Sequence, residues 1–69
     1  MDRDDRWIIR NFSQLIEQYS GQYIAVVHQR VVASGISAKQ VEQEAQRITG
    51  VALPSVLRLP RREDTLRVV

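Results

Sequence analysis

Apolar positions recur with the period of an α-helix near the start of the chain. The stripe at i, i+3, i+4 and i+7 consists of Phe12, Leu15, Ile16 and Tyr19. It predicts a helix over residues 11–19, with Asn11 as its N-cap and Gln14 completing a capping box. Ile8 extends the stripe by one turn, so the helix can begin as early as Asp4.

The same period returns in the second half of the chain. This stripe consists of Ala38, Val41, Ala45 and Ile48. Ser37 and Gln40 again form a capping-box pattern at its start. Gly50 suits the left-handed residue that ends a helix, as Gly21 does after the first stripe. We therefore expect a second amphipathic helix from Ser37 to Gly50.

Between the two stripes, two runs of strand-forming residues predict a β-hairpin. The runs are residues 22–27 and 30–34, and only His28 and Gln29 separate them. A two-residue hairpin turn needs positive φ at both positions and favours Asn-Gly or Asp-Gly. Because His28 and Gln29 suit that backbone poorly, we expect a longer loop or a bulge.

A third short strand, residues 55–59, is closed by Pro60. The order helix, strand, strand, helix, strand predicts an α+β fold in which helices pack against a three-stranded sheet. We expect one α-β-β-α-β domain over residues 1–60, followed by a charged C-terminal tail over residues 61–69.

Apolar side chains occupy both faces of the predicted hairpin. In the first strand, alternation separates Tyr23, Ala25 and Val27 from Ile24 and Val26. In the second strand, it places Val31 and Ala33 on one face and Val32 on the other. Large exposed apolar patches are rare on monomers, so both faces need cover from a helix or a second copy. The pattern predicts a homodimer that forms through the sheet face or its edge.

Length and composition favour the same interpretation. A chain of 69 residues without cysteine has a small core and no disulfide, and such chains often gain stability by association. No apolar run approaches the roughly 18–20 residues of a membrane span, and the acidic start is not that of a signal peptide. We expect a cytoplasmic protein that does not bind a membrane.

The sequence contains no recognisable catalytic, cofactor or metal motif. His28 is the only histidine and lies in a predicted turn without an evident nucleophile. Glu42 and Glu44 are two residues apart on a helix, so their side chains point in different directions. We expect no enzymatic activity, no cofactor and no metal.

Arginine dominates the basic charge, and it is concentrated at the end of the chain. The net charge is only +2, with three Asp and two Arg in residues 1–9 but four Arg and two acids in residues 55–69. Arg58, Arg61 and Arg62 are candidates for binding phosphates or acidic side chains. The alternative is that these charges keep an edge strand from aggregating. Trp7 is a candidate partner anchor, or else the largest side chain of a small core.

The hairpin region resembles a family of short, uncharacterised prokaryotic proteins that is known as a domain of unknown function. The resemblance rests on Tyr19, Gly21, Tyr23, Ile24 and Ala25, then on residues 31–35, a helix opening near Ser37, and Leu59-Pro60, with Trp7, Asn11 and Phe12 upstream. It implies the fold predicted above and no particular chemistry. The chain departs from the family pattern at the turn, where Gly or Asp is more usual than His28-Gln29.

The strand-strand-helix arrangement is also similar to that of HicB-like antitoxins, although their Leu-Pro-Gly segment is missing here. Two functional hypotheses follow. The first is a non-enzymatic protein-interaction module that forms a homodimer and engages another protein. The alternative is an antitoxin-like or nucleic-acid-associated regulator that binds through its basic C-terminal end.

Overall fold

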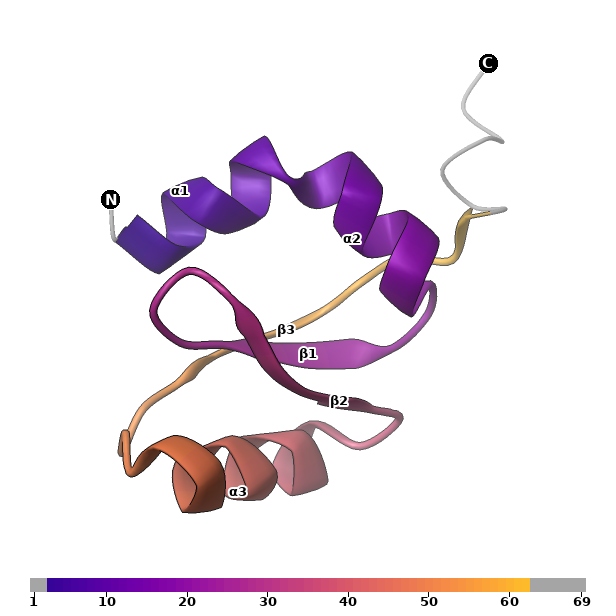
Figure 1. The fold of residues 1–69 in the computed structure, drawn as a ribbon. Coiled ribbons are helices and arrows are strands. Elements are labelled where there is room, and N and C mark those ends of the chain that lie inside the picture. The colour runs from indigo at the N-terminus through magenta and orange to yellow at the C-terminus, as the bar shows by residue number, and fades with distance from the viewer. Residues whose placement is uncertain (1–2, 63–69) are drawn as a thin grey trace.

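A three-stranded antiparallel sheet separates two helical layers (Figure 1). The computed structural model describes residues 3–62. Its elements are α1 (Arg3–Arg10), α2 (Phe12–Tyr19), β1 (Tyr23–Val26), β2 (Val31–Gly35), α3 (Ala38–Thr49) and β3 (Ser55–Arg58). The strand order is β2-β1-β3, with α1 and α2 on one face and α3 on the other. The predicted α+β class is confirmed, and the first helix is divided into two.

The division of the first helix occurs at Asn11, where φ is −107° and ψ is 16°. The predicted capping role of Asn11 is wrong, because its side chain makes no capping hydrogen bond to α2. Instead, Asn11 Nδ2 donates a hydrogen bond of 2.9 Å to the Trp7 carbonyl oxygen. An Asn amide can donate as well as accept, and here it donates to the last turn of α1 and holds the junction between the two helices.

The predicted N-cap of α3 and the predicted glycines after α2 and α3 are confirmed. The Ser37 hydroxyl oxygen accepts a hydrogen bond of 3.4 Å from the Gln40 backbone N–H, which is the expected N-cap of α3. Gly50 ends α3 with a φ of 73°, and Gly21 follows α2 with a φ of 72°. Both values lie in the left-handed region that glycine adopts without steric cost.

The hairpin turn has only two residues, His28 and Gln29, although neither residue type favours the positive φ that such a turn requires. His28 has a φ of 54° and Gln29 a φ of 62°, the pattern of a type I′ turn. The Val27 backbone N–H donates to the Arg30 carbonyl oxygen at 3.0 Å and closes the turn. A longer loop or a bulge was expected here. The structure has no longer loop, but β2 contains a bulge where it pairs with β1.

The bulge changes which side chains of β2 share a face. Pairing passes from Ala25 with Ala33 directly to Val26 with Val31, so Val32 is the extra residue. Val31 packs in the layer below α1 and α2, whereas Val32 and Ala33 both pack toward α3. The prediction that Val31 and Ala33 share a face is wrong, because one extra residue shifts the alternation.

Both faces of the sheet are covered by the chain's own helices. The buried residues between the sheet and the helices α1 and α2 are Ile8, Leu15, Ile16, Ile24, Val26 and Leu59. The buried residues between the sheet and α3 are Ala25, Val41 and Ala45. The predicted division of Ile24 and Val26 from Ala25 is confirmed. Among residues 3–62, both faces of the sheet are therefore covered, and its two edges, β2 and β3, have no further strand beside them.

None of the helices in the described part of the chain is long and apolar enough to cross a membrane. The predicted charged tail contributes Arg61 and Arg62 to the structure, and its remaining residues, 63–69, lie outside the described range.

Candidate functional site

An apolar groove runs between α1 and β3, which is one edge of the sheet. Its lining consists of Asp5, Ile8, Ile9, Ser55, Val56 and Leu57. Ile9 is 61% exposed although it lies beside the buried Ile8. Strand addition to a sheet edge uses main-chain hydrogen bonds together with pockets for side chains, and Ile9 of α1 places an exposed aliphatic side chain beside the β3 edge. We call these residues the β3 groove.

Two backbone amides of β3 point away from the sheet. The Leu59 N–H donates a hydrogen bond of 2.8 Å to the Gln22 carbonyl oxygen. In an antiparallel pair the backbone N–H groups of alternate residues point toward the partner strand, so the N–H groups that point toward β1 are those of the odd-numbered residues of this strand. The amides of Val56 and Arg58 therefore point toward the open edge. Pro54 and Pro60 flank the strand and limit the length over which a partner can pair.

The opposite edge, β2, is less regular. The extra residue Val32 interrupts its pairing with β1, and bulges are one way in which proteins protect an edge strand. Ile36 follows β2 and is 88% exposed, but it lies outside both apolar clusters. The β3 edge is the more suitable of the two for regular strand addition.

The three C-terminal arginines predicted to bind a partner do not form one patch. The Arg62 backbone N–H donates to the Ser20 hydroxyl at 2.7 Å, and its guanidinium lies 3.8 Å from a carboxylate oxygen of Glu17. Arg61 packs over Gly21. Arg58 lies on β3 between the inward-facing Leu57 and Leu59, so its side chain points toward the α3 side of the sheet.

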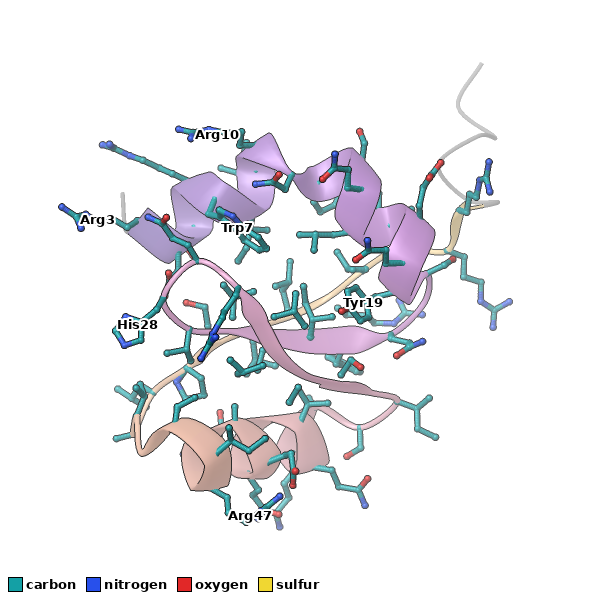
Figure 2. The ribbon with its side chains drawn as sticks, viewed as in Figure 1. Arg3, Trp7, Arg10, Tyr19, His28 and Arg47 are labelled. Carbon is teal, nitrogen blue, oxygen red and sulfur yellow. The ribbon has the colours of Figure 1, made fainter. Side chains whose placement is uncertain are left out.

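Trp7 is half-buried and packs against the cluster below α1 and α2. Its remaining exposed surface belongs to a shallow hollow between α1 and the hairpin turn, lined by Arg3, Arg6, Trp7, Arg10 and Gln29. Figure 2 shows Trp7 directed toward the hairpin, whereas Arg3 and Arg10 extend outward from the helix. Trp7 thus contributes both to the core and to this surface.

The three arginines of α1 form a basic surface that the charge count did not reveal. Arg3, Arg6 and Arg10 are three and four residues apart, so they lie along one side of the helix. All three are exposed. Residues 1–9 carry more acidic than basic side chains when their charges are simply summed. The helical spacing of the arginines was the signal that would have found this surface.

His28 lies at the hairpin turn and is exposed. It lines a second hollow together with Arg3, Asp4 and Gln29. Within residues 3–62, no group of three or more His, Cys, Asp or Glu side chains is placed to hold a metal ion. The expectation that the chain has no enzymatic activity stays a prediction.

Residues 14–62, which carry most of α2, the whole sheet and α3, match the family of unknown function DUF5678. The chain belongs to this family. Membership of a family of unknown function is thus confirmed, whereas the particular hairpin motif on which the resemblance was based is not. Neither a curated protein nor a solved structure matches the chain significantly, and the resemblance to HicB-like antitoxins is not confirmed. The DUF5678 match includes β3 and begins after α1, so the arginines of α1 lie outside it.

Proposed function

We propose that this protein is a small non-enzymatic interaction module that self-associates by pairing the β3 edges of two copies. The observation that supports this most directly is the coincidence of an open strand edge with the exposed side chain of Ile9 in the β3 groove. The occupant of the groove is the β3 strand of a second copy.

The strand is compatible with a symmetric pair. Only residues whose amides point outward can exchange hydrogen bonds with a partner strand. In an antiparallel pair centred on Leu57, Val56 lies opposite Arg58 of the second copy, and the reverse holds by symmetry. The two Leu57 side chains then face one another on the side of the sheet that carries α1.

The groove gives this pairing an apolar component. Leu57 is part of the cluster below α1 and α2, and Ile9 lies at the surface beside it. Burying a branched aliphatic side chain contributes about 1.5–3 kcal/mol. The paired strands are short, and interfaces smaller than about 1,200 Å² are characteristic of weak complexes. We therefore expect a reversible dimer.

The C-terminal alternative is not favoured by the contacts of its residues. The charge of Arg62 lies near Glu17, and its backbone is bound to Ser20. An ion pair of two exposed groups is weak, but the position of Arg62 directs its charge toward α2. Arg58 lies on another side of the sheet, so the described part of the predicted basic end is divided.

Sedimentation velocity over a wide range of protein concentration tests the proposal. Wild-type protein should shift from monomer to dimer as concentration rises. Ile9→Glu should remove this shift, because it introduces a charge into the groove without disturbing the buried core. The matched control is Ile36→Glu, which changes another exposed isoleucine outside the groove.

The proposal is wrong if the wild-type protein stays monomeric up to millimolar concentration, or if Ile36→Glu prevents dimer formation as effectively as Ile9→Glu. A monomer that instead binds extended peptides through the β3 groove would identify a different occupant and would equally contradict self-association.

A further inference from the structure

The arginine side chains of α1 lie at the surface and are not in contact with a carboxylate of the described chain. Within residues 3–62, Arg3, Arg6 and Arg10 form no ion pair and no side-chain hydrogen bond. At a rise of about 1.5 Å per residue, the outer two are separated along the helix by about 10 Å. We call these three residues the arginine face.

Planar groups lie next to this charge. The half-buried indole of Trp7 and the side chain of Gln29 line the same hollow as the arginine face. The imidazole of His28 lines the adjoining hollow. Arginine binds phosphate through paired hydrogen bonds, and aromatic rings in a basic groove provide surfaces on which unpaired bases stack.

One acidic group also borders this surface. Asp4 lines the hollow that contains His28, but its Oδ1 accepts a hydrogen bond of 2.9 Å from the Gln29 backbone N–H. The carboxylate is therefore engaged in holding the turn against α1. Asp5 belongs to the β3 groove and lies away from the arginine face.

We propose that the arginine face of α1, together with Trp7 and the hairpin turn, binds the phosphate backbone of single-stranded nucleic acid. An acidic peptide would satisfy the arginines but would not use the adjoining flat groups. A duplex is less suitable, because the eight-residue α1 is flanked by α2 and the hairpin and forms a shallow hollow rather than a protruding helix.

The test uses the full chain and fluorescently labelled single-stranded oligomers of thymidine or uridine, about 20 nucleotides long. Anisotropy measures affinity at about 50 mM salt and above. A single strand releases about 0.7 counterions for each phosphate contact, so three contacts predict a slope of about −2 in log affinity against log salt. Trp7 is the only tryptophan, so quenching of its fluorescence by the bases reports binding at this surface.

Two double variants with the same change in net charge separate this surface from general attraction. Arg6→Gln with Arg10→Gln should weaken binding about tenfold or more and reduce the slope by about 1.4. Lys39→Gln with Arg47→Gln alters exposed cations of α3, across the sheet from α1, and should change affinity less than about twofold. Thermal unfolding followed by circular dichroism confirms that each variant is folded.

A third pair, Arg58→Gln with Arg62→Gln, examines the C-terminal arginines and should behave like the α3 control. The proposal is overturned if the oligomers do not bind at low salt, if binding leaves Trp7 fluorescence unchanged, or if all three variants lose equal affinity. It is also overturned if a glutamate homopeptide binds more tightly than the oligomers and depends on the same arginines. These outcomes are independent of the oligomeric state, so they do not decide the β3 proposal.

Discussion

The backbone N–H of Gln29 donates a hydrogen bond of 2.9 Å to the side chain of Asp4, 25 residues earlier in the chain. This contact joins the tip of the β1-β2 hairpin to the first turn of α1. It places the turn beside the arginines of α1 and so defines one side of the proposed nucleic-acid surface. An acidic residue in the first turn of a helix is also favoured by the helix dipole.

Asp4→Ala should lower the free energy of unfolding by about 1 kcal/mol more than Asp5→Ala. Both substitutions remove a negative charge from the first turn of α1, but only Asp4 accepts the hydrogen bond from Gln29. Urea unfolding of the two variants provides the comparison. Equal losses would show that the contact contributes nothing to stability in solution.

Gln29→Gly should stabilise the protein by about 0.5–1 kcal/mol. Its φ of 62° is costly for a residue with a side chain and costs glycine almost nothing. The same substitution at Gln43, an exposed position within α3, should destabilise by about 1 kcal/mol. Thermal unfolding should therefore shift in opposite directions for the two variants, and a loss of stability in both would contradict the left-handed turn.

Leu59→Ala should leave the protein largely unfolded, because Leu59 is fully buried. Removing a buried leucine costs about 2–5 kcal/mol, and a core of this size supplies only about 3–5 kcal/mol in total. Leu53 is 87% exposed, so Leu53→Ala should change stability by less than about 0.5 kcal/mol. Circular dichroism at room temperature distinguishes these outcomes, and a well-folded Leu59→Ala variant would contradict the assigned core.

Much of the fold could be predicted from local patterns. The stripe through Val41 and Ala45 predicted α3, and Ser37 and Gly50 marked its ends, because these signals depend only on neighbours in sequence. The alternation of side chains along the first strand likewise placed Ile24 and Ala25 on opposite faces of the sheet, as the structure shows. The helix needed its period and its capping residues, and the strand needed only its alternation.

The features that could not be predicted depend on contacts between distant residues. The bulge at Val32 is a property of strand register, which alternation within one strand does not determine. The break at Asn11 depends on its side chain bonding to Trp7 in place of the cap that was expected. The exposure of the β3 edge depends on strand order, and the arginine face was missed because charges were counted along the chain.

The most direct test of the β3 proposal is hydrogen exchange at single amides, measured by NMR at several protein concentrations. The amides of Val56 and Arg58 point toward the open edge, whereas that of Leu59 is bonded to Gln22. We predict that Val56 and Arg58 exchange rapidly in dilute solution and more slowly as concentration rises, while Leu59 is protected throughout. Exchange at Val56 and Arg58 that is independent of concentration would contradict pairing through this edge.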